Sequence, residues 1–221
     1  MCGRYSFFSK DDIVEERWQA QIKMPLPRHF NAAPTEKLPI ILNTDPHAVV
    51  IGQWGLVPVW MKSKSTHPLI NARAETLTQK PSFRNAVRKH RCLVLADSFF
   101  EWDRRSGKKI PYRIFLRNEQ PFAFAGIWEL HRTPGGATVP TFSIVTVPSN
   151  DLISPLHDRM PAILQPESEQ LWLDPSAAAE LALATLRPYG SDLMSMYPVS
   201  AAVNSVRNDS PEVIRPDRQI P

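Results

Sequence analysis

The chain contains 22 prolines but only 8 glycines among its 221 residues. Proline fixes the backbone φ angle and has no N–H to donate, so it ends helices and is excluded from central strand positions. Apolar residues are plentiful between the prolines, which argues against a disordered chain. The proline content therefore predicts a folded protein with many fixed turns and short strands.

Apolar runs bounded by turn residues predict strands at 38–42, 48–54, 91–96, 112–117, 122–128 and 141–147. Capping patterns predict helices at 9–20, 81–89 and 174–186, the last capped by Asp174 with Pro175 at its first position. These elements do not alternate as regular βαβ units. The pattern favours an α+β fold with a curved, mainly antiparallel, barrel-like sheet flanked by helices. No linker divides the chain, so we expect one domain over residues 1–221, with 207–221 as an extended C-terminal tail.

No run of about 18 apolar residues predicts a membrane span, and the N-terminus does not have the pattern of a signal peptide. We therefore expect a cytoplasmic protein. Its two cysteines, Cys2 and Cys92, have no metal-like spacing, and we predict neither a metal nor an organic cofactor. Cys92 lies in an apolar run and is predicted to be a buried core residue.

The net charge is +4 and the sequence pI about 9.2, which permits a polyanionic partner. Two short segments of the chain are rich in basic residues. The first spans residues 84–91 and could lie along a groove that holds phosphates. The second spans residues 104–109 around Gly107, and we interpret it as a solvated hairpin loop.

The opening Met-Cys-Gly-Arg places a cysteine directly after the initiator methionine. Removal of Met1 would give Cys2 a free α-amine next to its thiol. An α-amine titrates near ~7.7–8.0, so part of it is neutral at cellular pH and can condense with an aldehyde. The thiol, activated by Arg4 nearby, could then close on the imine carbon to give a thiazolidine. From these residues alone, an incidental cysteine remains equally open.

Three further segments hold polar residues where packing alone would not put them. Asn71, Arg73 and Glu75 alternate with small residues, so in an extended segment their side chains would share one face and could form a polar site. An edge strand with one face in solvent would have the same sequence pattern. Glu101 lies among aromatic residues, and apolar surroundings would raise the pKa of its carboxyl and could make it a general acid or base. Alternatively, its side chain could simply face solvent. His157 has charged neighbours that could orient it for proton exchange.

An aromatic segment at 54–60 completes the set of candidates. We interpret Trp54 as core packing, whereas Trp60 could stack on a nucleobase. Together the segments supply a nucleophile, an amide, a carboxylate, an imidazole and arginines, as carbonyl-addition chemistry on an anionic substrate requires.

The combined motifs resemble the SRAP (SOS response-associated peptidase) family of abasic-site processing proteins over almost the whole chain. They are Met-Cys-Gly-Arg at 1–4, Asn-x-x-Pro at 31–34, Trp-Gly-Leu-x-Pro-x-Trp at 54–60, Ile-Asn-Ala-Arg-x-Glu-Thr at 70–76, Ser-Phe-Phe-Glu-Trp at 98–102, His-Asp-Arg-Met-Pro at 157–161 and Val-Asn-Ser at 203–205. Alanine at 32, where the family often has valine, is expected to change packing only.

The resemblance implies the SRAP fold and a DNA-damage function: a covalent thiazolidine crosslink between the processed Cys2 and abasic sites in single-stranded DNA. By matching motif, Asn71 would bond near the new ring, Glu101 would position the α-amine and move protons, and His157 would promote sugar ring opening. DNA would be bound by Arg4, Trp60, Arg73, Arg84 and Arg159. The resemblance also implies self-removal of Met1 as a peptidase activity, a weak lyase activity through the imine, and nucleoid association when bound to DNA. We expect a monomer.

Other function classes remain open at this point. An N-terminal-nucleophile amidohydrolase also begins Met-Cys-Gly, but it would not require Glu101 or His157. A non-catalytic single-strand DNA-binding module would bind as well without Cys2. A protease acting on other chains could use Cys2 and His157, although the sequence indicates no substrate pocket.

Overall fold

The computed structural model describes residues 3–61, 68–105, 107–133 and 135–218. Its strands are β1 (Tyr5–Phe7), β2 (Gln21–Ile22), β3 (His29–Ala32), β4 (Lys37–Leu42), β5 (Asp45–Trp54), β6 (Asn71–Arg73), β7 (Arg91–Ala96), β8 (Ser98–Asp103), β9 (Ile110–Leu116), β10 (Phe122–Arg132), β11 (Thr138–Pro148), β12 (Arg159–Pro161) and β13 (Met194–Pro198). Its α-helices are α1 (Asp11–Trp18), α2 (Arg84–Lys89), α3 (Pro166–Leu173) and α4 (Ala179–Ala184), and its 3₁₀ helices are η1 (Ala74–Thr76), η2 (Ser191–Leu193), η3 (Ala201–Asn204) and η4 (Pro211–Ile214).

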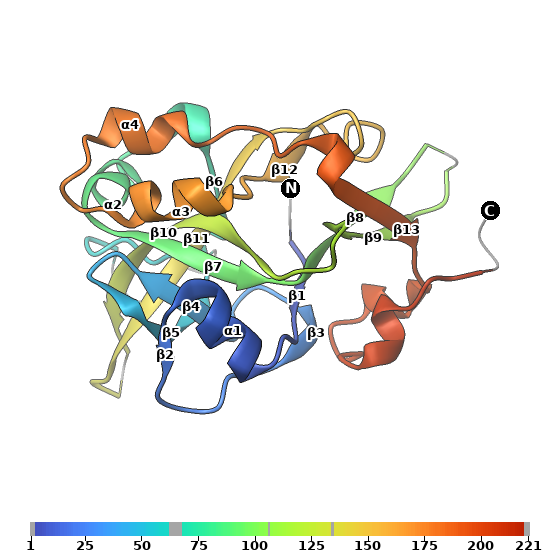
Figure 1. The fold of residues 1–221 in the computed structure, drawn as a ribbon, viewed down its shortest axis with the longest axis horizontal. Helices are drawn as coiled ribbons and strands as arrows, with labels where there is room; N and C mark the ends of the chain where they lie inside the picture. The colour runs from blue at the N-terminus through green and yellow to red at the C-terminus, as the bar shows by residue number, and fades with distance from the viewer. Residues whose placement is uncertain (1–2, 62–67, 106, 134, 219–221) are drawn as a thin grey trace.

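Five strands form a closed barrel in the order β11-β10-β7-β4-β5. All neighbours in this ring are antiparallel except β5 and β11, which close it through the parallel pairs Thr141↔Gln53 and Phe142↔Trp54. Strands β12 and β6 extend the sheet from β11, and β2 extends it from β5. The predicted α+β class with a mainly antiparallel, barrel-like sheet is therefore confirmed. A second, five-stranded sheet of order β13-β9-β8-β1-β3 was not predicted (Figure 1).

The two sheets are joined where β7 ends and β8 begins, with only Asp97 between them. Asp97 is 7% exposed, and its carboxylate accepts hydrogen bonds from the backbone N–H groups of Phe8 at 2.6 Å and Ser9 at 3.0 Å. This contact fixes the end of β1 against the junction. The first strand therefore enters the molecule between the barrel and the second sheet.

The core lies inside the barrel and is dominated by aromatic and branched side chains. The ring of Tyr5 packs edge-on against those of Trp54 and Phe124, with centroids 5.1 and 5.7 Å apart. Gly126 faces Cys92 across β10 and β7, and a Cβ there would lie 2.7 Å from the Cys92 sulfur. The predicted burial of Cys92 and Trp54 is confirmed, and burial raises the pKa of the Cys92 thiol.

Several predicted elements have different bounds. The helix predicted from Asp174 to residue 186 is wrong at its start, because Asp174 ends α3 and α4 begins only at Ala179. Asp174 instead accepts hydrogen bonds from the backbone and hydroxyl of Ser176, which holds a turn. Residues 81–83 form a turn before α2 rather than the start of that helix. The predicted C-terminal tail is not wholly extended, because η4 forms within it and buries Val213.

No helix of the described residues is long and apolar enough to cross a membrane.

Candidate functional site

A cavity of about 260 Å³ lies beside strand β8 of the second sheet. It brings together two residues predicted for chemistry, Glu101 and His157, which are far apart in the sequence. The described residues that line it are Gly3, Glu101, Trp102, Arg104, Lys109, Leu156 and His157. This cavity therefore combines a carboxyl group, an imidazole and two cationic side chains.

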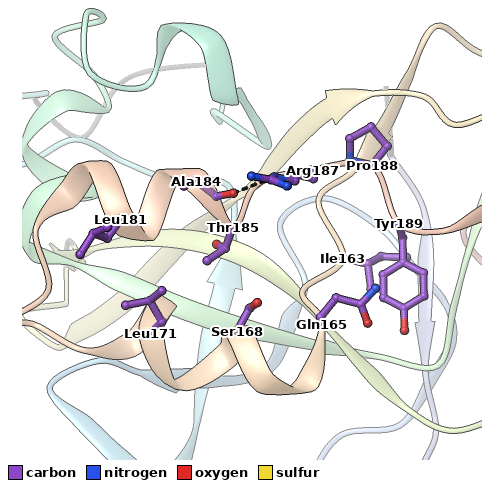
Figure 2. Close-up of a pocket in the computed structure, with 10 residues that line it drawn as sticks. All are labelled: Ile163, Gln165, Ser168, Leu171, Leu181, Ala184, Thr185, Arg187, Pro188 and Tyr189. Atoms are coloured by element: carbon purple, nitrogen blue, oxygen red, sulfur yellow. Dashed lines mark hydrogen bonds between the residues drawn. The ribbon is translucent and has the colours of Figure 1, made fainter.

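A larger cavity, of about 440 Å³, lies between α3 and α4 (Figure 2). Its walls are mostly apolar, and the Arg187 side chain donates to the Ala184 carbonyl at 3.1 Å from its Nε. No described acid–base pair converges there comparable to Glu101 and His157. We therefore place the candidate site at the smaller cavity.

Glu101 lies in the middle of β8, paired with Tyr112 of β9. The alternative that it simply faces solvent is wrong, because the chain forms a second strand directly after β7 and buries the residue. The side chain is 4% exposed, and this burial raises the pKa of the carboxyl, while nearby positive charge on His157 and Arg104 acts in the opposite direction. A buried carboxyl group of raised pKa that lies beside an imidazole is a candidate general acid or base.

The N-terminal segment reaches the cavity as the neighbour of β8. Tyr5 pairs with Phe99 and Ser6 with Ser98, and the Phe100 N–H donates to the Arg4 carbonyl at 3.0 Å. The same antiparallel register, continued toward the N-terminus, aligns Gly3 with Glu101. Cys2, the predicted nucleophile, lies outside the described residues.

Arg4 is held by a network that joins the start of the chain to its C-terminal part. Its Nη1 donates to Asn31 Oδ1 and to the Val203 carbonyl, each at 2.8 Å. The Asn31 amide in turn donates to the carbonyls of Val203, Ser205 and Asn208 at 3.2, 3.0 and 2.7 Å. The guanidinium predicted to hold a phosphate is therefore bound to protein acceptors, and partial burial lowers its pKa.

His157 lies in the loop before β12, with its side chain 30% exposed. Its Nδ1 accepts from the Arg159 backbone N–H at 2.9 Å, and Asp158 Oδ1 lies 2.8 Å from the same nitrogen. A neutral ring with its proton on Nε2 makes the first contact, whereas an imidazolium donates in the second. The Nδ1 atom of His157 thus has both a donor and an acceptor within hydrogen-bonding distance.

Asn71 and Arg73 lie on β6, which runs parallel to β11 with Asn71 aligned to Ile144 and Arg73 to Thr146. Strand β12, which follows His157, pairs with the same region of β11 through Thr146 and Pro161. The topology therefore places Arg73 level with Pro161, the last residue of β12, because both are aligned with Thr146 of β11. Neither is among the described residues that line the cavity.

Glu75 and Arg159 do not occupy the positions predicted from the sequence. The chain turns into η1 after Arg73, so Glu75 leaves the face it was expected to share with Asn71. Its carboxylate instead accepts two hydrogen bonds from Arg159, at 2.5 and 2.9 Å, which lower the pKa of Glu75. Arg159 is 9% exposed and also donates to the Thr146 carbonyl at 2.5 Å. In this structure the Arg159 guanidinium is therefore held by protein acceptors, and its predicted contact with a DNA phosphate stays a prediction.

Three of the predicted DNA-binding residues are exposed. Trp60 is 61% exposed, and Arg73 and Arg84 lie on the surface. Arg91, in contrast, is buried and donates to the carbonyls of Trp172 and Asp174 at 2.6 and 2.5 Å. The predicted phosphate groove along residues 84–91 therefore cannot include Arg91.

Sequence reasoning missed Trp102, Arg104 and Lys109 as residues of the site. The loop at 104–109 does join β8 to β9 as the predicted hairpin, but Arg104 and Lys109 line the cavity. The signal was present: the loop follows Glu101 closely, and a hairpin returns its far end to the same place. Among the described residues, no group of three or more His, Cys, Asp or Glu side chains could hold a metal ion.

A model of the family "SOS response associated peptidase (SRAP)" matches residues 1–206 of the chain. The chain is 44% identical to the abasic site processing protein YoqW of Bacillus subtilis (strain 168) over 225 residues, covering 97% of this chain and 99% of that protein. It is 33% identical to the abasic site processing protein HMCES of Gallus gallus over 222 residues, covering 85% and 66%.

Solved structures have the same fold. The crystal structure of a protein from Bacteroides thetaiotaomicron superposes with a TM-score of 0.89 at 30% identity, covering 98% of this chain and all of that one. A protein from Bordetella bronchiseptica superposes with a TM-score of 0.79 at 27% identity, covering 90% of this chain and all of that one.

Proposed function

The chain belongs to the SOS response associated peptidase (SRAP) family, and we propose that it captures abasic sites in single-stranded DNA as a covalent DNA–protein crosslink. The observation that carries this proposal is the cavity that Gly3, Glu101 and His157 line together. Gly3 follows Cys2 in the chain, so the α-amine and thiol of a processed Cys2 belong to the residue next to the cavity wall. The names of the relatives supply the substrate class.

The proposed reaction begins with opening of the abasic sugar ring to its aldehyde form. His157 would donate a proton to the ring oxygen as the C–O bond breaks, while the anomeric hydroxyl loses its proton to water and becomes the aldehyde oxygen. The Cys2 amine adds to the aldehyde carbon, and loss of one water gives an imine. The Cys2 thiol then adds across the C=N bond, the sulfur bonding to carbon and the thiol proton ending on nitrogen, which closes a thiazolidine without any oxidant or reductant.

Glu101 would serve this reaction as the group that accepts a proton from the amine and returns one to the departing hydroxyl. Its burial, which raises the pKa of the carboxyl, and its place in the cavity beside His157 support this role. Asn71 would hydrogen-bond near the new ring from strand β6. The imine stage also permits β-elimination, from which we propose a weak lyase activity.

DNA binding would rest first on the exposed candidates Trp60, Arg73 and Arg84. Trp60 would stack on a base next to the lesion, and the two arginines would contact phosphates. Arg4 and Arg159, in contrast, already donate to protein acceptors in this structure. We therefore propose that these two act mainly by holding the N-terminal segment and β12 in place. The protein would also remove its own Met1.

The test is a crosslinking assay with single-stranded DNA in which uracil glycosylase has made one abasic site. The wild-type protein should give a band that survives denaturation without borohydride and has the mass of DNA plus protein lacking Met1. Cys2→Ala should give none, while Cys92→Ala should react like wild type, because Cys92 is buried in the barrel. A processed wild-type protein that forms no band would refute the proposal.

The same variants separate the remaining alternatives. An N-terminal-nucleophile amidohydrolase would hydrolyse an amide substrate in the absence of DNA and would tolerate Glu101→Gln. A DNA-binding module without chemistry would bind the oligonucleotide equally well as wild type and as Cys2→Ala, and would never form a covalent band.

A further inference from the structure

The hairpin loop between β8 and β9 places two cationic side chains, Arg104 and Lys109, on the wall of the cavity that holds Glu101. We propose that Arg104 and Lys109 together form a binding site for the DNA phosphate next to the abasic sugar. This inference rests on the proposed function, and it assigns a contact to a loop that the sequence alone suggested was only solvated.

The strand register explains why these two residues meet. Asp103 pairs with Ile110 as the last pair of the β8–β9 ladder, so Arg104 and Lys109 are the first residues beyond it, one at each end of the loop. A hairpin reverses the chain direction, so the two ends of its loop lie near each other. The hairpin therefore presents its two loop-end cations as a pair.

Trp102 holds one member of this pair in position. The Lys109 ammonium lies 4.8 Å from the centre of the Trp102 ring, and the indole Nε1 donates to Asn204 Oδ1 at 2.7 Å. A cation over an aromatic face is attracted by the ring quadrupole. The indole is thus fixed from one side by Asn204, and the ammonium is pre-organised at the cavity before any ligand arrives.

Other cations of the same loop are differently engaged. Arg105 donates from Nε and Nη2 to the two oxygens of Asp103, at 3.0 and 2.7 Å, so its charge is already neutralised. Lys108 is exposed and is not among the residues that line the cavity. Neither Arg104 nor Lys109 forms an ion pair within 4.0 Å with a residue that the structure describes, although Arg104 is close enough to Glu101 to act against the rise in the pKa of that carboxyl.

The charge arrangement favours an anion between the two side chains. Two adjacent cations repel each other, and a phosphate oxygen placed between them removes that repulsion. The same phosphate would otherwise meet the carboxyl group of Glu101 in the cavity, which repels it when ionised. A cationic pair at this wall therefore allows a phosphate next to the reacting sugar to come close to Glu101 and His157.

The test measures DNA binding separately from crosslinking. The probe is a fluorescent single-stranded oligonucleotide with one tetrahydrofuran residue, which mimics the abasic sugar but has no aldehyde. Its affinity is measured against KCl concentration for wild type, the double variant Arg104→Ala/Lys109→Ala and the control Lys108→Ala. Melting curves establish that all three proteins are folded.

We expect the double variant to bind about tenfold more weakly at low salt. Its salt slope should be lower by about 0.7, the value for a single phosphate of a DNA strand that is no longer neutralised. Lys108→Ala should bind within about twofold of wild type, because an exposed cation away from the site adds little. Replacing one phosphate beside the tetrahydrofuran by an uncharged methylphosphonate should weaken wild type about tenfold, and the double variant hardly at all.

Two results would overturn the inference. The first is a double variant that binds the oligonucleotide as tightly as Lys108→Ala does. The second is a methylphosphonate that weakens binding of wild type and of the double variant equally, whichever of the two flanking phosphates it replaces. Neither result would contradict the proposed function, because that function is tested separately by the crosslinking of the wild-type protein. Conversely, loss of binding in the double variant would support the phosphate site even if wild type formed no crosslink.

Discussion

Two clusters of basic residues, 84–91 and 104–109, look alike in the sequence but have different environments in the structure. The first surrounds the start of β7, where Arg91 is buried and binds backbone carbonyls of the α3 end. The second forms the β8–β9 hairpin, where Arg104 and Lys109 line the cavity with Glu101. Charge density alone did not distinguish them, because the partner strands decide which cations face carbonyls and which face open space.

The strongest test of this difference is to remove the buried guanidinium. Arg91→Ala should lower the free energy of unfolding by about 3 kcal/mol, since the carbonyls of Trp172 and Asp174 lose their donor and the side chain leaves a cavity. Urea unfolding measures the effect. Lys89→Ala, an exposed neighbour, should change it by less than about 0.5 kcal/mol. Equal effects of the two variants would show that the burial of Arg91 is not what holds α3 to β7.

The second cluster shares its cavity with the carboxyl group of Glu101 on strand β8. Glu101→Gln should slow crosslinking about 100-fold, the size expected for loss of a general acid–base group. Asp103→Asn is the matched control, because Asp103 is two residues further along β8 and pairs with Arg105 rather than lining the cavity. Rates are taken from time courses on denaturing gels. If both variants slow the reaction equally, the effect arises from the hairpin fold and not from proton transfer by Glu101.

The same substitution should also change how stability depends on pH. Burial raises the pKa of Glu101, so the folded protein favours the protonated carboxyl. Its stabilising contribution is complete below the unfolded-state pKa of about 4.3 and is lost as the pH rises through the higher folded-state pKa. The free energy of unfolding of wild type should therefore fall relative to Glu101→Gln as the pH rises above about 4.3. A difference that stays constant over this range would contradict the assigned direction of the shift.

A smaller effect is expected from the indole that supports the hairpin. Trp102→Phe keeps an aromatic face for Lys109 but loses the hydrogen bond to Asn204, which should cost about 1 kcal/mol of stability. Asn204→Ala removes the same bond from the other partner. Thermal unfolding of the two single variants and the double variant gives the coupling between them. A coupling near zero would mean that the 2.7 Å contact does not hold the indole.

The smallest effect should come from the exposed part of the first cluster. Arg84→Ala should weaken binding of the tetrahydrofuran oligonucleotide by about twofold and leave stability within about 0.5 kcal/mol of wild type. Fluorescence anisotropy at low salt measures the binding. A loss larger than that of Arg104→Ala/Lys109→Ala would reverse the ranking of the two clusters.

The sequence predicted those features that depend on local pattern. Strand β7 has the predicted bounds, and the burial of Cys92 and Trp54 follows from the apolar and aromatic residues around them. The pairing of Glu75 with Arg159 was not predictable, because it depends on η1 turning the chain after Arg73 and on β11 bringing β12 alongside. The proximity of Glu101 and His157 came from the family resemblance, since no local pattern relates residues so far apart in the chain.

The network around Asn31 has a consequence for the order of folding. Arg4 contacts Val203 across 199 positions, and Asn31 contacts it across 172. Such contacts close very long loops and form late, whereas the ladders of β4 with β5 and of β10 with β11 join strands that are adjacent in the chain. We expect the barrel to assemble before the start of the chain is fastened beside β8. A stopped-flow refolding experiment should therefore show Trp128 of the barrel becoming protected before Trp102, and reactivity would be the last property the molecule acquires.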